Sequence, residues 1–284
     1  MNYVEQLKQR YQETGNIVCV GMDPVIEKIP LTTAKTEPAK AIERFYTDMI
    51  YAFTAENTIP ACVKPNIAFF EQYDVEGIIA LKNIIKRCKE AKIPILLDAK
   101  RGDIGKTSKA YAKAIFDVLK VDAVTVAPYM GSDSVNPFIE YCEKGKGVYV
   151  LVRTSNKGAV DLQDLKVEGI PIYMKTAEKL VEWHKPGVCA VIGATYPAEL
   201  KEINTFFANS GKEIPILLPG VGAQGGSAEE VIKILKNTTK DGNIGIYRIN
   251  SSSGINYAYQ KYDTDDYAGA AVKALKELIK TIHR

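Results

Sequence analysis

Three successive apolar runs of this 284-residue chain end in a charged side chain: Asp23, Lys64 and Asp98. Lys100 and Asp103 follow shortly after Asp98. Residues two apart in an extended strand point to the same side, so Asp98 and Lys100 are predicted to lie together. Neighbouring strands lie about 4.8 Å apart, which puts Lys64 within reach of Asp98 if their runs are adjacent strands. The spacing therefore predicts an alternating array of lysine and aspartate.

An array of this kind has a definite chemical use. One pair of unit charges about 4 Å apart is worth roughly 4 kcal/mol at an effective dielectric near 20, which holds the lysines charged and fixes their direction. An ammonium proton donor then lies beside a carboxylate that repels an anionic substrate group. This combination suits the formation and protonation of a carbanion, and it needs no metal ion and no cofactor. The alternative interpretation is a solvated loop with incidental ion pairs. It is disfavoured because three apolar runs in succession end in a charged residue.

The elements that must position these residues are short apolar runs separated by helical patterns. Each run suits a strand that is buried on both faces. The eight runs cover residues 17–23, 61–64, 94–98, 122–126, 147–152, 188–192, 214–218 and 244–249. The clearest helical patterns cover residues 39–55, 75–91, 106–119 and 265–283.

About eight strand–helix units predict an α/β fold of the (β/α)₈ or TIM-barrel type, as a single domain over residues 1–284. A doubly wound sheet is the second interpretation. Its first strand is usually followed by Gly-x-Gly-x-x-Gly, whereas here Asp23 is followed by Pro24-Val25-Ile26. In a barrel the active site lies at the carboxyl ends of the strands, where the charged residues are expected to gather.

Three loops after the later runs add polar groups. The loops at 219–226, which contains Gln224, and at 250–254, which contains Ser253 and Gly254, are rich in glycine or serine. In barrels, the loops after strands seven and eight commonly bind a phosphate through backbone N–H groups. A plain turn is the alternative for each loop. The loop at 153–158, which contains Ser155, offers donors for a heterocycle or an amide.

The composition limits the possible partners and compartment. The net charge of +3 is too small to indicate nucleic acid or an anionic membrane as a partner. The 5 cysteines are widely spaced, which predicts neither a zinc site nor a disulfide framework and favours a reducing compartment. There is no apolar run long enough for a membrane helix and no signal-peptide pattern at the start. We expect a cytoplasmic protein.

Taken together, these segments resemble the orotidine 5′-phosphate decarboxylase family, in its longer bacterial and archaeal subgroup. The segment Asp98-x-Lys100-x-x-Asp103-Ile104 matches the central motif of that family. Further matching segments run in order along most of the chain, from Gly21 to Gly254. They are Gly-Met-Asp-Pro at 21–24, Val-Lys-Pro-Asn-Ile-Ala-Phe-Phe-Glu at 63–71, Arg-Thr-Ser-Asn-Lys-Gly-Ala at 153–159 and Pro-Gly-Val-Gly-Ala-Gln-Gly-Gly at 219–226.

The resemblance implies a cofactor-free homodimeric barrel that converts orotidine 5′-monophosphate to uridine 5′-monophosphate and carbon dioxide. It implies that Lys100 protonates C6 of the pyrimidine and that Asp98 lies against the substrate carboxylate. Lys64 is implied to hold Asp98 and to contact the ribose. The resemblance also implies that Asp103 and Thr107 reach into the partner's site, so that the two active sites are shared.

The remaining implied contacts are with the substrate alone. Asp23 is implied to bind a ribose hydroxyl, Ser155 the pyrimidine and Gln224 the phosphate region. In one respect the chain departs from the family, which usually carries a phosphate-binding arginine in the loop after strand eight, where Ser253 stands here. Arg248 lies five residues earlier and is expected either to be outward-facing or paired in the core, or to reach the phosphate from below.

Two other functions remain open from the sequence. The first is a magnesium-dependent sugar-phosphate decarboxylase or aldolase-like relative with the same barrel and the same Asp-x-Lys-x-x-Asp motif. The second is a catalytically silent barrel that binds a phosphorylated ligand. The silent barrel would require one member of the charged array to be missing, and all of them are present.

Overall fold

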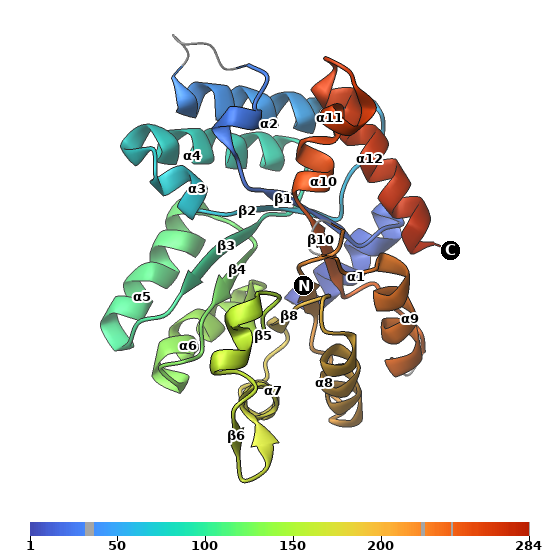
Figure 1. Cartoon of the computed structure of the whole chain (residues 1–284). Coiled ribbons are helices and arrows are strands. Elements are labelled where there is room, and N and C mark those ends of the chain that lie inside the picture. Colours follow the sequence, from blue (N-terminus) through green and yellow to red (C-terminus); the bar gives the residue numbers. More distant parts are fainter. Residues whose placement is uncertain (32–36, 223–224, 240, 284) are drawn as a thin grey trace.

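Eight parallel strands form a ring at the centre of the computed structural model, which describes residues 1–31, 37–222, 225–239 and 241–283 (Figure 1). Their order around the ring is β2-β1-β10-β9-β8-β5-β4-β3. The strands are β1 Val18–Met22, β2 Cys62–Pro65, β3 Leu96–Arg101, β4 Ala123–Val126, β5 Gly147–Arg153, β8 Val188–Ile192, β9 Ile216–Leu218 and β10 Arg248–Ser251. Strands β6 Lys166–Val167 and β7 Ile170–Pro171 lie outside the barrel and form a small antiparallel hairpin.

The ring closes between its first and last strands, β2 and β3. Parallel bridges join Val63 to Ile95 and Asn66 to Asp98. The Val63 N–H donates to the Pro94 carbonyl at 2.9 Å, and the Ile67 N–H donates to the Asp98 carbonyl at 3.2 Å. The sheet is therefore a closed barrel without free edges, and the predicted (β/α)₈ fold is confirmed.

Helices surround the barrel on its outside (Figure 1). Those of eight or more residues are α1 Tyr3–Thr14, α2 Pro38–Ala55, α4 Asp74–Glu90, α5 Gly105–Lys113, α6 Ser132–Ile139, α7 Ile172–Glu182, α8 Pro197–Asn209, α9 Ala228–Thr238 and α12 Tyr267–Ile282. Shorter helical segments are η1 Ile26–Lys28, α3 Ala68–Glu71, η2 Ala114–Leu119, η3 Glu140–Lys144, η4 Lys157–Asp161, α10 Ser253–Asn256 and α11 Ala258–Tyr262. The observed α2, α4, α5 with η2, and α12 lie where the sequence predicts helices.

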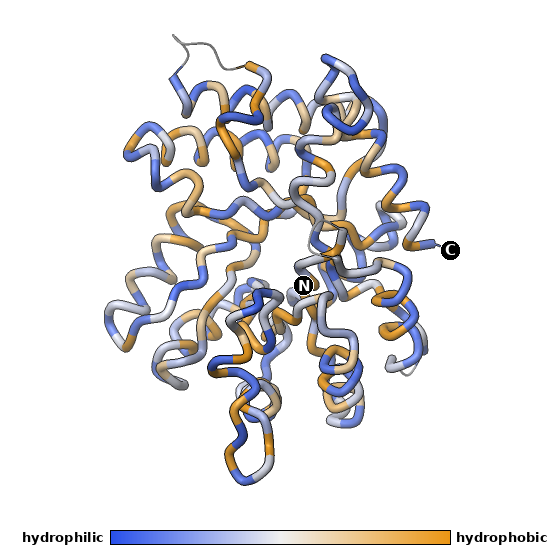
Figure 2. Tube along the Cα trace, in the orientation of Figure 1, coloured by the Kyte–Doolittle hydropathy of each residue, from blue (hydrophilic) through white to orange (hydrophobic). Residues whose placement is uncertain are grey.

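Burial explains why these segments adopt this arrangement. Every residue of β1, β4 and β8 is buried, because their side chains pack alternately into the barrel and against the helices. The outer helices alternate hydrophobic and hydrophilic residues (Figure 2), as expected for helices that bury one face on the strands. The core thus lies both within the barrel and between the barrel and the helices.

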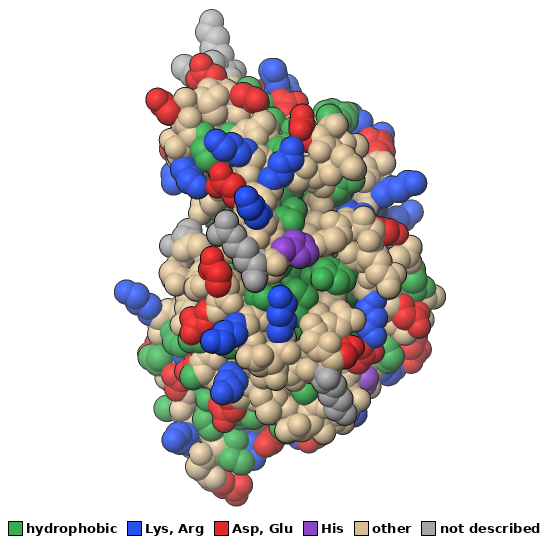
Figure 3. Space-filling view, turned by 90° about the vertical axis from the view of Figure 1, so that its right-hand side faces the viewer, with side chains coloured by type: hydrophobic (Ala, Val, Ile, Leu, Met, Phe, Trp, Pro, Cys, Tyr) green, Lys and Arg blue, Asp and Glu red, His purple; other side chains and the backbone are tan. Residues whose placement is uncertain are grey.

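The outer surface carries both signs of charge. On the face seen in Figure 3, Lys and Arg side chains are interspersed with Asp and Glu. Among the described residues, no helix is long and apolar enough to cross a membrane. All five cysteines are free and buried.

The predicted eighth strand, residues 244–249, is confirmed only at Arg248 and Ile249. The strand begins only at Arg248, and residues 244–247 form a turn in which the Tyr247 N–H donates to the Ile244 carbonyl at 3.0 Å. Ile244 and Tyr247 are buried at the amino-terminal end of the barrel. The apolar run therefore indicated burial rather than a strand. As a result, Asn250 and Ser251 belong to β10 and not to the loop that follows it.

Arg248 is a core residue with 1% of its surface exposed. Its Nη1 donates to the carbonyls of Gly245 and Tyr247 at 2.9 and 2.7 Å, and its Nη2 donates to the Leu7 carbonyl of α1 at 3.2 Å. It lies at the start of β10, opposite to the carboxyl ends of the strands. Of the two expectations for Arg248, pairing in the core is confirmed and reaching a phosphate is wrong.

We expect Arg248→Met to lower the free energy of unfolding by about 3 kcal/mol, because it leaves buried carbonyls without their donor. Urea unfolding measures the change. The control is Arg44→Met, which should have almost no effect, since Arg44 is mostly exposed and its one ion pair among the described residues is with Asp48 at 3.6 Å. Equal stabilities of the two variants would contradict a structural role for Arg248.

Candidate active site

A cavity of about 760 Å³ opens at the carboxyl ends of the barrel strands. Its lining includes residues from the loops after β1, β5, β9 and β10 as well as from the strands themselves. Seven of the residues predicted for the site line it: Asp23, Lys64, Asp98, Lys100, Ser155, Ser253 and Gly254. The structure therefore brings together residues that lie up to 231 positions apart (254 minus 23) in the sequence.

The carboxylate of Asp98 lies between two lysines. Its Oδ2 accepts from Lys64 Nζ at 2.8 Å, and its Oδ1 accepts from Lys100 Nζ at 2.6 Å. The Lys64 and Asp98 side chains are 5% and 10% exposed, whereas the Lys100 side chain is 50% exposed. The predicted lysine–aspartate array is confirmed for these three residues, and Lys100 is the member that remains accessible from the cavity.

Burial and charge act in opposite directions on this array. Burial alone raises the pKa of Asp98, but the positive charges of Lys64 and Lys100 outweigh it and hold that pKa well below its usual range. Burial alone lowers the pKa of Lys64, but the negative charges of Asp98 and Asp23 raise it above its usual value. Asp98 and Lys64 are therefore both charged at neutral pH.

Thr125 on β4 supports the array, and the sequence analysis did not single it out. Its hydroxyl donates to Asp98 Oδ1 at 2.8 Å and accepts the backbone N–H groups of Ala99 and Lys100, both at 3.0 Å. One buried hydroxyl thus fixes both the Asp98 side chain and the backbone that carries Lys100. The sequence feature that could have pointed to Thr125 is its polar side chain within the apolar run at 122–126.

The sequence predicted the right neighbours but the wrong backbone geometry. β3 does not end at Asp98; it continues to Arg101. Its register against β4 shifts between Leu97 and Arg101, and Lys100 has a φ of +45°. Such a left-handed conformation is uncommon for residues other than glycine. Lys100 therefore reaches Asp98 from a bulge that the Thr125 hydroxyl stabilises, and not from a regular extended strand.

Asp23 and Ser155 lie on the cavity wall after β1 and β5. Asp23 Oδ1 is buried and has no hydrogen-bond partner among the described residues, so pairing it requires a donor from outside them, such as a water or a ligand hydroxyl. The Ser155 segment lies against Gly193 after β8. A Cβ at position 193 would lie 2.7 Å from Ser155 Cα, so only glycine lets the two segments approach so closely.

The loops after β9 and β10 form another part of the wall. Gly220 and Val221 line the cavity after β9, and Ser252, Ser253 and Gly254 line it after β10. Asn250 and Ser251, which the sequence placed in the loop, line the cavity from within β10. Gln224 lies outside the described residues.

Asp103 and Thr107 are not among the residues that line this cavity. Asp103 Oδ1 accepts from the Ile104 N–H at 2.8 Å, and Thr107 is exposed on α5. Among the described residues, no group of three or more His, Cys, Asp or Glu side chains is placed to hold a metal ion.

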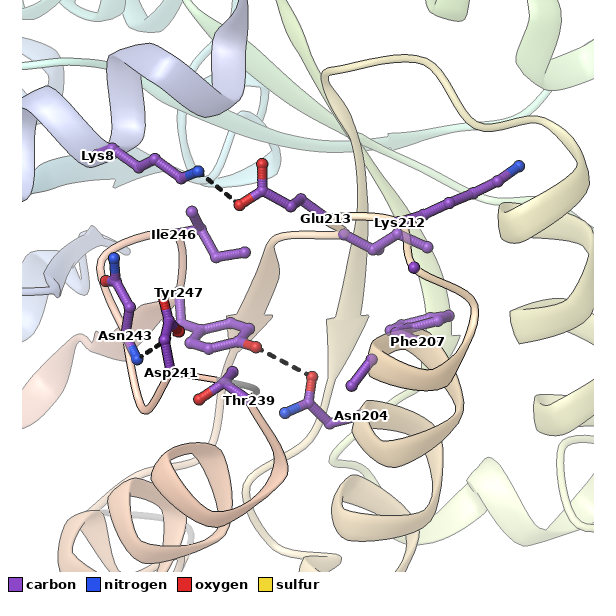
Figure 4. Close-up of a pocket in the computed structure, with 13 residues that line it drawn as sticks. Lys8, Asn204, Phe207, Lys212, Glu213, Thr239, Asp241, Asn243, Ile246 and Tyr247 are labelled. Atoms are coloured by element: carbon purple, nitrogen blue, oxygen red, sulfur yellow. Dashed lines mark hydrogen bonds and ion pairs between the residues drawn. The ribbon is translucent and has the colours of Figure 1, made fainter.

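A second cavity, of about 240 Å³, lies at the opposite end of the barrel (Figure 4). There Lys8 of α1 is ion-paired with Glu213 before β9. The Tyr247 hydroxyl donates to Asn204 Oδ1 of α8 at 3.2 Å. None of the predicted site residues lines this cavity.

A closed barrel with a charged lysine–aspartate array in a large cavity at the carboxyl ends of its strands defines an enzyme of the (β/α)₈-barrel class. Comparison with known proteins identifies the family within this class. The family model described as "Orotidine 5′-phosphate decarboxylase / HUMPS family" matches residues 17–259. The chain belongs to this family.

Similar proteins extend over the full chain. An orotidine 5′-phosphate decarboxylase of Halorubrum lacusprofundi is 40% identical over 100% of this chain and 99% of its own length. One from Cupriavidus metallidurans is 40% identical over 100% of this chain and 98% of its own length. The solved structure of Leishmania donovani OMP decarboxylase covers 100% of both chains with a TM-score of 0.78 and 34% identity.

We expect Thr125→Val to lower the free energy of unfolding by about 2 kcal/mol, because Asp98 loses a donor and two N–H groups lose their acceptor. Thr125→Ser keeps the hydroxyl and serves as the matched control. Urea unfolding of both variants measures the difference. A valine variant as stable as the serine variant would show that the hydroxyl does not hold the bulge.

Proposed function

We propose that this chain decarboxylates orotidine 5′-monophosphate to uridine 5′-monophosphate and carbon dioxide, with Lys100 as the proton donor. The observation that carries the proposal is the ion-paired array of Lys64, Asp98 and Lys100 inside the cavity. Membership of the decarboxylase family supports the same reaction.

The chemistry follows from the charges. The bond between C6 and the substrate carboxylate breaks, its electron pair stays on C6, and carbon dioxide leaves. The half-exposed Lys100 ammonium then transfers a proton to C6. A fixed cation beside the developing carbanion lowers its energy at little reorganisation cost, because the Asp98 carboxylate already orients it.

Asp98 has a different role in this scheme. Because its carboxylate is ionised and buried, it repels a substrate carboxylate bound next to it and disfavours the ground state. Lys64 neutralises the other Asp98 oxygen and anchors the array. Asp23 and Ser155 are proposed to bind a ribose hydroxyl and the pyrimidine, and Ser253, Gly254 and Gln224 to lie by the phosphate. The residues of the chain supply each of these roles without a cofactor.

We further propose a homodimer whose active sites are shared, with Asp103 and Thr107 completing the partner's site. These two residues flank Ile104, which is 51% exposed, and the neighbouring loop after β4 exposes Tyr129 and Met130 by 88% and 44%. The two loops are adjacent, because the Ala127 N–H donates to the Arg101 carbonyl at 2.8 Å. An apolar surface beside Asp103 and Thr107, which do not line the cavity of their own chain, suits a second copy of the chain.

The compartment is part of the same proposal. Free, buried cysteines are typical of a reducing compartment, so we place the enzyme in the cytoplasm. The proposed substrate is a small nucleotide, and the net charge of +3 does not favour nucleic acid as a partner.

Purified protein should consume orotidine 5′-monophosphate in the presence of a chelator, followed by ultraviolet absorbance, and Lys100→Ala should lower kcat at least about a hundredfold. The matched control is Lys82→Ala, because Lys82 is an exposed residue of α4. Circular dichroism checks that each variant folds. Near-normal turnover by Lys100→Ala would contradict its role, and no turnover by the folded wild type would contradict the reaction.

Mixing Lys100→Ala protein with Asp103→Ala protein should restore part of the activity. Each variant alone lacks one essential group in every site, whereas a mixed dimer contains one site with both groups intact. Subunit exchange, followed with differently tagged chains, is the control. Exchange without any recovery of turnover would contradict the shared site.

A further inference from the structure

The substrate of the proposed reaction carries a phosphate monoester, and the structure raises the question of which cation binds it. A phosphate dianion is bound more strongly when a cation donates to it in addition to neutral donors. Among the described residues that line the cavity there are three lysines, Lys28, Lys64 and Lys100, and no arginine. Lys64 and Lys100 are both engaged with Asp98.

We propose that Lys28 supplies the positive charge for the substrate phosphate, a proposal that rests on the proposed function. Lys28 is the last residue of η1, after β1, and its side chain is exposed. Within the described part of the chain it forms no ion pair with a carboxylate, in contrast to the other two lysines of the cavity. Among the described residues that line the cavity, Lys28 is thus the lysine whose ammonium can pair with an anionic ligand without leaving a carboxylate partner.

Contacts with the chain after β10 hold Lys28 at the wall that includes Ser253 and Gly254. The Lys28 ammonium lies 5.5 Å from the centre of the Tyr257 ring, within the range of a cation–π contact. The Tyr257 N–H in turn donates to the Ser253 carbonyl at 3.0 Å. The ammonium therefore contacts the ring of a residue that lies one helical turn after Ser253.

Hydrogen bonds with two tyrosine hydroxyls fix the backbone of the segment that carries Lys28. The Tyr257 hydroxyl accepts from the Val25 N–H at 2.7 Å and donates to the Asp23 carbonyl at 3.2 Å. The Tyr259 hydroxyl donates to the Lys28 carbonyl at 3.0 Å. The backbone is thus anchored at both ends of η1, while the lysine side chain remains free to turn from the ring toward a ligand.

Two arginines near this end of the barrel are already engaged. Arg153 is fully buried, pairs with Asp164 and stacks on Tyr196, and Arg101 pairs with Glu71 at 2.7 Å. Arg248 lies at the opposite end of the barrel. Ser253 offers only a neutral hydroxyl where the resemblance places an arginine, and Lys28 is the lysine that lines the same cavity without a carboxylate partner among the described residues.

The test compares the binding of uridine 5′-monophosphate and of uridine by calorimetry, because the two ligands differ only in the phosphate. We expect Lys28→Ala to weaken uridine 5′-monophosphate about tenfold, the effect of losing one charge-assisted hydrogen bond, and to leave uridine unchanged. Lys28→Arg should keep the wild-type preference. Lys82→Ala removes a lysine outside the cavity and should change neither affinity.

The outcomes separate this proposal from the function on which it rests. An unchanged preference for the phosphorylated ligand in Lys28→Ala would overturn the role of Lys28, and so would an equal loss of affinity for both ligands. Turnover of orotidine 5′-monophosphate by the wild type is measured in parallel. If the wild type neither turns over this nucleotide nor prefers uridine 5′-monophosphate to uridine, the proposed function itself fails.

Discussion

The buried carboxylate of Asp98 is the constraint around which the site is built. An unpaired carboxylate at this depth would be strongly destabilising, and three groups from three strands offset that cost: Lys64, Lys100 and the hydroxyl of Thr125. The Asp98 backbone also takes part in the bridge that closes the barrel between β2 and β3. The contacts that stabilise the charge therefore also join neighbouring strands, and the site cannot form without the fold.

The same constraint explains the proposed chemistry. A carboxylate that is held ionised beside an ammonium gives a site with fixed charges of both signs, and little reorganisation is needed during the reaction. Lys64 is buried and serves as an anchor, whereas the half-exposed Lys100 faces the cavity. Two lysines that contact one aspartate thus have different roles, and their burial determines which role each one takes.

The sequence predicted the barrel and most of the array, because buried strands and charged strand ends are local patterns. It placed the start of the eighth strand too early, because the apolar residues 244–247 fill the amino-terminal end of the barrel in a turn. It also missed the bulge at Lys100 and the part played by Thr125, since both depend on a contact between β3 and β4. The sequence did not single out Lys28, whose place at the cavity and contact with Tyr257 come from segments more than two hundred residues apart.

The central claim is that two lysines keep Asp98 ionised, and titration of that carboxylate tests it most directly. The ¹³C resonance of the Asp98 carboxyl carbon, assigned with Asp98→Asn, would be followed by NMR from neutral to acidic pH. We predict no protonation of Asp98 around pH 4, where an ordinary aspartate is half protonated, because its pKa is held well below the usual range. A midpoint near 4 or above would contradict the account.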